Sequence, residues 1–210
     1  MPIKAVIWDL GGVILRTEDP QPRQQLADRL GISRDDLEEL IFHGTSGRRA
    51  QLGEISVSEH WDNVRQILGI PVQDLPALQQ AFWGGDRIDE SLLDRIRMLQ
   101  SQYKIGLLSN AFSDLRQVIT EYWKFADVFE EMIISAEVGL MKPDVRIYHL
   151  ALEQLAASPD EAVFIDDFAR NIEGSRAVGI HAIHFLNCAQ AWEELQSLLS
   201  DHKPRPKASR

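Results

Sequence analysis

Short apolar runs rich in β-branched residues recur along the chain, and most of them stop at a polar residue. The runs cover residues 3–8, 104–108, 132–134, 162–165 and, with weaker character, 181–184. Nearly continuous apolar runs of this length are typical of strands that are buried on both faces of a parallel sheet. The pattern therefore predicts five buried strands.

Apolar residues with helical spacing fill the stretches between these runs. They form four faces: Leu92, Leu93, Ile96 and Leu99; Tyr148, Leu152 and Leu155; Ile172 and Val178; and Trp192, Leu195, Leu198 and Leu199. Strands that alternate with helices are typical of an α/β fold with a parallel sheet. We therefore predict that fold class for the chain.

Residues 16–85 interrupt this alternation, because they contain helix starts and no convincing strand. Asp19-Pro20 resembles a cap followed by proline, and Ser33 and Ser56 each begin a capping-box pattern. Glycines at 31, 69 and 84–85 mark helix ends. A stretch this long is too large for a crossover connection, so we predict a helical cap inserted over 16–85 into a core formed by 1–15 and 86–200.

Composition and charge narrow the class of protein. The chain has 210 residues, of which 44% are hydrophobic, and a formal charge of −10, so we expect a folded protein that does not bind nucleic acid. No apolar run of 18 residues and no signal peptide is visible, which predicts a cytoplasmic protein without a membrane span. Cys188 is the single cysteine and cannot form an internal disulfide. Residues 201–210 carry a net +3 and are expected to be a disordered tail.

Polar side chains follow the predicted strands at their carboxyl ends. They are Asp9, Ser109-Asn110, Ser135 and Asp166-Asp167, and Lys142 lies in the loop after the third strand. Ligands of open parallel sheets bind at this edge. Three carboxylates repel one another unless a cation lies between them, and an all-oxygen site suits Mg²⁺. With a hydroxyl and a lysine beside an acidic nucleophile, the set favours phosphoryl transfer.

These motifs and their order resemble the haloacid dehalogenase superfamily, in which Mg²⁺-dependent phosphatases dominate. Four motifs carry the resemblance: Val6-Ile-Trp-Asp-Leu-Gly-Gly-Val13, Leu108-Ser-Asn110, Lys142-Pro143 after Gly139, and Phe164-Ile-Asp-Asp followed by Ile172 and Gly179-Ile180. The resemblance spans most of Ile3 to Leu199 and implies a Rossmann-like core with a helical cap after the first motif. It also implies a phosphoric monoester hydrolase acting on a small phosphorylated metabolite, while the cap chooses the substrate.

The resemblance assigns a role to each matching position. Asp9 would be the nucleophile that forms an aspartyl-phosphate, and Lys142 would offset charge on Asp9 and on the phosphate. Ser109 and the backbone of Asn110 would bind the phosphoryl group. Mg²⁺ would be held by Asp9, the carbonyl of Gly11, Asp167 directly and Asp166 through a water. The assignment within the Asp166–Asp167 pair stays open.

Gly11 departs from the family pattern, which usually has a second aspartate there as general acid and base. Glycine keeps the carbonyl but cannot transfer a proton. General acid–base assistance gives about 10²- to 10⁴-fold, so we expect leaving groups of low pKa, such as a sugar anomeric phosphate or an acyl phosphate.

Several residues in the cap or in nearby loops have competing interpretations. His43, His60 and His149 are candidates for a substitute acid, although a lone histidine is more often packed or on the surface. Arg48-Arg49 would either bind a second anion or form a solvated helix face. For the aromatic residues Trp61, Phe82 and Trp83, core packing is favoured over substrate stacking.

Three alternative functions were weighed. A phospho-ligand-binding or regulatory protein with weak or no turnover is motivated by Gly11. A response-regulator receiver is rejected, because there the acidic pair lies on the first strand. A literal haloacid dehalogenase needs no Mg²⁺, so Asp166-Asp167 argue against it. The oligomeric state, monomer or homodimer, is left open.

Overall fold

Strand β1 (Ala5–Trp8) lies at the centre of a five-stranded parallel sheet in the computed structural model, which describes residues 2–202. Its neighbours are β4 (Lys104–Ser109) and β6 (Ala162–Asp166), with Trp8 opposite Leu107 and Ile165. The outer strands are β5 (Glu131–Ile134) and β7 (His181–His184), which gives the order β5-β4-β1-β6-β7. All five predicted strands are confirmed.

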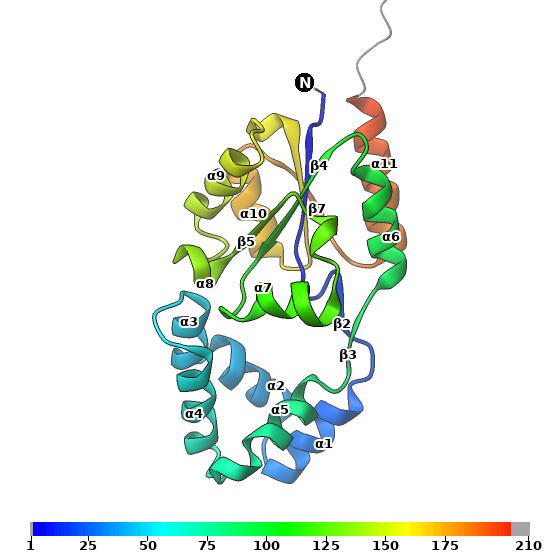
Figure 1. Cartoon of the computed structure of the whole chain (residues 1–210). Helices are drawn as coiled ribbons and strands as arrows, with labels where there is room; N and C mark the ends of the chain where they lie inside the picture. The colour runs from blue at the N-terminus through cyan, green and yellow to red at the C-terminus, as the bar shows by residue number, and fades with distance from the viewer. Residues whose placement is uncertain (1, 203–210) are drawn as a thin grey trace, which may run out of the picture.

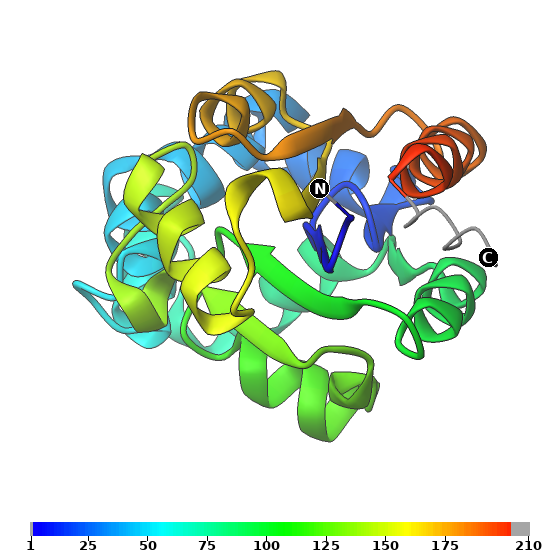
Figure 2. The same ribbon diagram turned by 90° about the horizontal axis from the view of Figure 1, so that it is seen from above.

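Helices cover both faces of this sheet, as Figures 1 and 2 show. On one face α9 (Val145–Gln154) and α10 (Ala169–Ala177) pack in a cluster with Ile7 and Phe164. On the other face α6 (Glu90–Leu99) and α11 (Cys188–Asp201) pack with Val6 and Trp8. Since β1 has buried side chains toward both layers, its residues 5–8 are all fully buried. The predicted α/β fold with a Rossmann-like sheet is confirmed.

A group of helices lies between the first two motifs in the sequence and below the sheet in Figure 1. It consists of α1 (Gln21–Leu30), α2 (Arg34–Glu38), η1 (Glu39–His43), α3 (Thr45–Gln51), α4 (Val57–Ile67), η2 (Val72–Asp74) and α5 (Leu75–Trp83). The Ser33 hydroxyl caps α2 by accepting from Asp36 N, and Ser56 forms a complete capping box with Glu59. Both serines are therefore N-caps, and the predicted capping box is confirmed in full at Ser56.

These helices have a hydrophobic cluster of their own. Leu26, Leu37, Ile41 and Phe82 are among its buried residues, and Phe112 joins it from the loop after β4. Ile41 of this cluster lies in the π-helical turn η1, and the sequence contained no signal that predicted a π-helix. Because it has its own apolar cluster, we keep the name cap for residues 16–85, and the predicted division of the chain stays a prediction.

Two short strands connect the cap to the sheet, and the sequence prediction missed both. Strands β2 (Leu15–Thr17) and β3 (Asp86–Ile88) pair antiparallel, with Arg16 opposite Arg87. Each is three residues long with one apolar residue, Leu15 or Ile88, so they lack the apolar run that marks a buried strand. The prediction of no strand from Arg16 onward was therefore wrong over Arg16–Thr17.

The remaining short helices lie in the connections between the strands of the sheet. They are α7 (Leu115–Gln117), η3 (Val118–Trp123), η4 (Ala126–Val128), α8 (Ser135–Val138) and η5 (Pro159–Glu161). Helix α11 includes Asp201, the first residue of the predicted tail, and 203–210 lie outside the described residues. Within 2–202, the helices are all too short or too polar to span a membrane.

Candidate functional site

The ammonium group of Lys142 joins two of the predicted site aspartates. Lys142 Nζ lies 2.8 Å from Asp9 Oδ1 and 2.7 Å from Asp166 Oδ2. Asp9 follows β1 and Asp166 ends β6, so the two adjacent strands deliver their carboxylates to the same edge. Lys142 is 2% exposed and Asp9 6% exposed. A buried ammonium has three hydrogens, and two of them are used here, which leaves one for a ligand.

The Asp166 carboxylate is fully engaged within the protein. Its Oδ2 accepts from Lys142 Nζ and from Asn171 Nδ2, and its Oδ1 accepts from Asn171 Nδ2 and from Phe168 N, at distances of 2.7–3.0 Å. A carboxylate has about four lone-pair sites. These bonds occupy the carboxylate, so Asp166 holds Lys142 and the start of α10 in place.

Asp167 differs from its neighbour because one of its oxygens has no partner. Its Oδ1 is buried and accepts no hydrogen bond from the described residues. Its main chain is fixed from behind, where His184 Nε2 donates to the Asp167 carbonyl at 2.8 Å. A Cβ at Gly12, whose φ is +78°, would lie 2.0 Å from Asp167 Oδ2. Glycine at position 12 therefore makes room for this carboxylate.

The loop after β4 is tied to the lysine loop by a side-chain amide. Asn110 Nδ2 donates to the Lys142 carbonyl at 3.0 Å, and Lys142 N donates to Asn110 Oδ1 at 2.8 Å. Ser109, the last residue of β4, is buried and lines the same cavity as Asp9 and Lys142. The Ser135 hydroxyl, directly after β5, accepts from Ala111 N at 2.9 Å and so supports this loop.

The electrostatics of the cluster are dominated by excess negative charge. Asp9, Asp166 and Asp167 each offer a carboxylate oxygen within 4.8 Å of the others, against one ammonium. Burial raises the pKa of Asp9 well above its ordinary value, and the charges of Asp166 and Asp167 raise it further against the opposing effect of Lys142. Burial also raises the pKa of Asp167 to about 6, with help from the charge of Asp166.

Lys142 stays charged in this setting. Burial alone favours the neutral amine, but the negative charges of Asp9 and Asp166 outweigh burial and raise the pKa of Lys142. Formally, three carboxylates and one ammonium leave the cluster with two negative charges. A divalent cation would neutralise that charge, and the unpartnered Asp167 oxygen is a donor for it. The residues present therefore fit a divalent metal ion.

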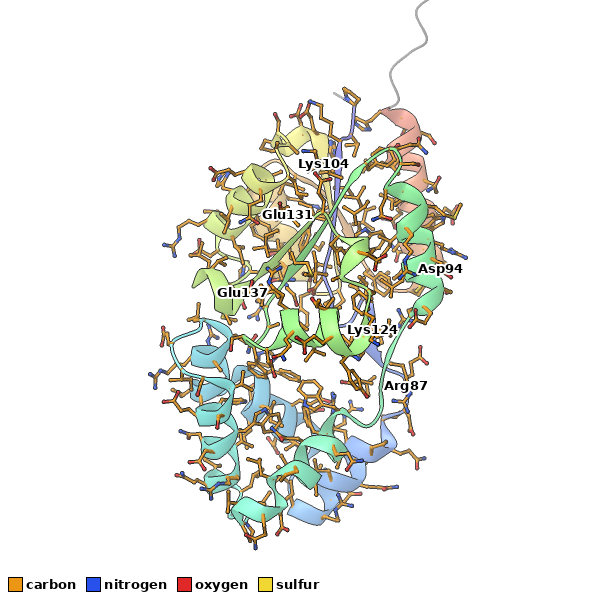
Figure 3. The ribbon with its side chains drawn as sticks, viewed as in Figure 1. Arg87, Asp94, Lys104, Lys124, Glu131 and Glu137 are labelled. Carbon is orange, nitrogen blue, oxygen red and sulfur yellow. The ribbon has the colours of Figure 1, made fainter. Side chains whose placement is uncertain are left out.

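A cavity of about 1100 Å³ opens above this cluster, between the sheet edge and the cap. Of the predicted site residues it is lined by Asp9, Gly11, Ser109, Asn110, Lys142 and Asp167. Asp166 lies beneath the lining and is fully buried. Figure 3 shows Arg87 on the connection between sheet and cap, where its guanidinium donates to the carbonyls of Gly84 and Asp86.

The three histidines that are candidates for a substitute acid lie in different environments. His43 lines the cavity. His60 is completely buried in the cap, where its Nδ1 lies 3.0 Å from Ser46 Oγ, and burial lowers its pKa to about 4. His149 is exposed on α9 and is not part of the cavity lining. At neutral pH, His60 is uncharged and sealed from the site, so of the three only His43 faces a substrate.

The arginine and aromatic candidates also differ in whether they line the cavity. Arg48 and Arg49 are exposed on α3 and do not line the cavity, and Arg49 pairs with Glu54 at 3.2 Å. This placement favours the solvated helix face. Phe82 is buried in the cap cluster, as predicted, whereas Trp61 and Trp83 contribute to the cavity wall. Core packing was therefore the right interpretation for Phe82 and an incomplete one for the two tryptophans.

Three residues that matter for the geometry escaped the sequence analysis. Asn171 holds Asp166, His184 holds the Asp167 carbonyl, and Gly12 admits the Asp167 carboxylate. Asn171 is in the first turn of α10, directly before Ile172 of the fourth motif, and that position is the signal that could have identified it. His184 belongs to the weakest predicted strand and had no signal of its own.

A family model described as haloacid dehalogenase-like hydrolase matches residues 3–179. The chain belongs to this family. The resemblance drawn from the four motifs is thereby confirmed, and so is the expectation of an enzyme that is a hydrolase. The match includes every motif residue from Asp9 to Asp167 and all of the cap.

Two phosphatases are similar to this chain over nearly their full length. The chain is 27% identical to a sesquiterpene phosphatase of Aspergillus oryzae over 201 residues, which cover 93% of this chain and 96% of the relative. It is 24% identical to a D-ribitol-5-phosphate phosphatase of Bacteroides thetaiotaomicron, with 94% and 99% covered. A crystal structure of a family enzyme from the same bacterium, in complex with magnesium and inorganic phosphate, matches with a TM-score of 0.72 at 26% identity, covering 86% of this chain and 93% of that one.

Proposed function

We propose that this hydrolase is a Mg²⁺-dependent phosphatase of a small phosphorylated molecule and that it works through an aspartyl-phosphate on Asp9. A phosphatase acting on a phosphate monoester agrees with the family and with the full-length relatives. The observation that carries the mechanism is the bridge from Lys142 Nζ to Asp9 and Asp166, beside an Asp167 oxygen without a partner.

The proposed metal ligands are Asp9, Asp167 and the carbonyl of Gly11. The four hydrogen bonds on Asp166 favour Asp167 as the direct carboxylate ligand, with Asp166 acting through Lys142 or through a water. Bound Mg²⁺ would offset the charge of the phosphoryl oxygens and of the carboxylates around them. The magnesium in the related Bacteroides thetaiotaomicron structure supports this choice of ion.

The nucleophile in this proposal is the second oxygen of Asp9. Its Oδ1 accepts from Lys142 Nζ and from Leu10 N, so the carboxylate is held in one orientation and Oδ2 is left to attack phosphorus. As the Oδ2–phosphorus bond forms, the bond from phosphorus to the ester oxygen breaks and the leaving group departs with that electron pair. The remaining hydrogen of Lys142 and the Ser109 hydroxyl donate to the phosphoryl oxygens.

Hydrolysis of the acyl phosphate completes the cycle. A water oxygen attacks phosphorus, the bond to Asp9 breaks, and the carboxylate is restored. One hydrogen of the water stays on the new phosphate oxygen and leaves with inorganic phosphate. The other passes to solvent, which supplies the proton that the leaving-group oxygen takes up. The same donors, Lys142 and Ser109, serve both steps because the charge on the phosphoryl oxygens develops at the same place.

Gly11 sets the leaving groups that this site favours. No carboxylic acid stands at position 11 to protonate the ester oxygen, and such assistance is worth about 10²- to 10⁴-fold, or roughly 3–5 kcal/mol. Esters whose leaving groups have a low pKa need less of it. Acyl phosphates and sugar anomeric phosphates meet that condition, and so do aryl phosphates.

The test uses the purified chain with p-nitrophenyl phosphate, acetyl phosphate and a panel of sugar phosphates. We expect phosphate release that needs Mg²⁺, stops in excess EDTA and is lost in Asp9→Asn. The matched control is Asp35→Asn, which changes an aspartate that is 90% exposed and should keep wild-type turnover. Full activity of Asp9→Asn, or activity in EDTA, would contradict the nucleophile or the metal assignment.

The same assay addresses the competing function. A phospho-ligand-binding protein would bind inorganic phosphate in the presence of Mg²⁺, detected by calorimetry, and would release no phosphate from acetyl phosphate. That combination of results would replace the proposed enzyme by a binding protein.

A further inference from the structure

The cavity above the carboxylate cluster is much larger than a phosphoryl group requires. Ligand pockets that bury a whole drug-sized molecule measure roughly 300–1,000 Å³, and this one measures about 1100 Å³. The polar cluster of Asp9, Ser109, Lys142 and Asp167 supplies only part of its lining. The rest must therefore contact the part of the substrate that leaves.

Aromatic side chains from both the cap and the core line this remainder. They are Phe42, Trp61 and Trp83 from the cap, and Phe112, Tyr122 and Trp123 from the loop and helices after β4. We call these six residues the aromatic wall. Phe42 and Trp83 are half-buried, with ring centroids 5.7 Å apart, so each keeps free surface toward the cavity.

Packing holds these two rings rigidly. Phe112 stacks on Phe42 with centroids 6.5 Å apart, and Trp61 meets the edge of Trp83 at 6.5 Å. Both supporting residues are buried, at 8% and 3% exposure. Rings fixed in this way form a preorganised apolar surface, which costs little conformational entropy when a ligand binds.

The part of the aromatic wall that belongs to the core includes an exposed tyrosine. Tyr122 on η3 is 79% exposed and still lines the cavity, next to the half-buried Trp123. Tyr122 extends the apolar lining from the cap across to the core.

The cap supplies little free charge to this space. Two arginines of the cap line the cavity: Arg16 pairs with Asp89 at 2.6 Å, and the other is Arg23. Its guanidinium pairs with Glu38 at 2.9 Å and with Asp86 at 3.0 Å, and it lies 4.1 Å from the Phe82 ring centroid. Arg23 is therefore neutralised, and the amide of Gln51 is likewise spent on the carbonyls of Phe42 and Gly47.

We infer that the substrate is a phosphate monoester with a large apolar, ring-sized body, which stacks against the aromatic wall while its phosphate lies at Asp9. The inference rests on the proposed phosphatase function and adds the class of its leaving group. A phosphate of a fused aromatic alcohol satisfies two features at once, because its body matches the wall and its low leaving-group pKa suits a site with glycine at position 11. A free sugar phosphate would cover the wall with hydroxyl groups and leave it unused.

The experiment compares substrates that differ in body size but little in leaving-group pKa. Phenyl phosphate and 2-naphthyl phosphate form that pair, glucose 1-phosphate supplies a polar body, and acetyl phosphate supplies almost none. For the wild type, we expect kcat/KM for 2-naphthyl phosphate to exceed that for phenyl phosphate by about tenfold, because the second ring buries further apolar surface. We expect glucose 1-phosphate to fall below both.

Two substitutions test whether the aromatic wall causes this preference for 2-naphthyl phosphate. In Trp83→Ala and Phe42→Ala, the ratio of the two kcat/KM values should fall to near one, mainly through a higher KM for 2-naphthyl phosphate. Trp83→Phe keeps a ring and should keep part of the ratio. Trp192→Ala is the matched control, since Trp192 is a half-buried tryptophan on α11 that does not line the cavity, and it should keep the wild-type ratio.

The outcomes separate this inference from the function on which it rests. If the wild type releases phosphate from none of the four compounds, the proposed phosphatase function fails. If it releases phosphate, but 2-naphthyl phosphate is no better than phenyl phosphate, or glucose 1-phosphate exceeds both, the apolar substrate class is wrong. Turnover of acetyl phosphate by each variant shows that it has folded, and an unchanged ratio in folded Trp83→Ala and Phe42→Ala would remove the wall from substrate binding.

Discussion

The side-chain amide of Asn110 and the main chain of Lys142 exchange two hydrogen bonds, of 3.0 and 2.8 Å. One residue belongs to the loop after β4 and the other to the loop after α8, so the pair fixes two segments that are far apart in the sequence. The Lys142 ammonium in turn reaches Asp9 and Asp166. The position of the positive charge in the site therefore depends on an amide that does not touch that charge.

Asn110→Ala should lower activity without unfolding the protein. Each lost hydrogen bond is worth about 0.5–1.5 kcal/mol, so we expect kcat/KM to fall by roughly ten- to hundredfold as Lys142 loses its position. The measurement is steady-state kinetics with p-nitrophenyl phosphate, together with thermal unfolding. Asn63→Ala on α4, where the asparagine is exposed, is the control. An unchanged kcat/KM in Asn110→Ala would show that the two loops hold Lys142 without the amide.

Gly12→Ala and Gly11→Ala form a matched pair in adjacent positions. At Gly12 the backbone is left-handed, which costs an L-residue roughly 1–2 kcal/mol, and the new Cβ would collide with Asp167 Oδ2. At Gly11 a Cβ meets nothing within 4 Å. We expect Gly12→Ala to have a lower melting temperature and to need more Mg²⁺ for half-maximal activity, while Gly11→Ala behaves as the wild type. Equal Mg²⁺ requirements would place the metal away from Asp167.

Gly11→Asp tests whether the missing acid limits turnover. Open space around position 11 admits the larger side chain. A carboxylic acid there should accelerate hydrolysis most for alkyl phosphates, by up to about 10²-fold at the lower limit of general acid catalysis. The measurement is kcat on glycerol phosphate and on p-nitrophenyl phosphate. A folded variant with equal or lower rates on the alkyl ester would show that proton transfer is not the limiting defect.

His60 makes stability depend on pH. Burial lowers its pKa in the folded protein to about 4, from 6.5 in an unfolded chain. Between these values the unfolded chain binds more protons, so the free energy of unfolding decreases as pH falls from 6.5 to 4. At about 1.4 kcal/mol per pKa unit, the loss is roughly 3 kcal/mol by pH 4.

The measurement is urea unfolding at intervals from pH 7 to pH 4. In His60→Gln the group no longer titrates, so its contribution to the slope should vanish, whatever the effect of the substitution on stability at pH 7. His149→Gln is the control, because His149 is exposed on α9 and should leave the slope unchanged. Identical slopes in the wild type and in His60→Gln would contradict the lowered pKa.

The sequence alone predicted those elements whose residue types are determined by burial. The five sheet strands were predictable because residues such as Val6, Ile7 and Phe164 are buried between two helical layers and must all be apolar. Strands β2 and β3 escaped because each has three residues and places one apolar side chain, Leu15 or Ile88, against the core, which is too few to form an apolar run. The same reasoning explains the missed π-helical turns, whose extra residue leaves no periodic trace in five or six positions.

Within the site, the motifs predicted which residues meet but not what holds them. Asp9, Lys142 and Asp166 were predictable together, because their strands or loops end at one edge of the sheet. Asn171 and His184 contact the acidic pair through tertiary packing, which a single sequence does not display. The aromatic wall was visible only in part, because Trp83 has the same helical spacing whether it faces the cap interior or the cavity.

The central position of β1 has a consequence for how the chain is made. This strand is synthesised before both of its partners, which begin at residues 104 and 162. The chain must therefore be made as far as β6 before Trp8 and its neighbours are covered on both edges. Helices α1 to α5 have their partners within residues 21–83, so they are free to pack much earlier. Non-local pairing of this kind slows folding, and the newly made chain depends on protection of an apolar first strand until β6 emerges.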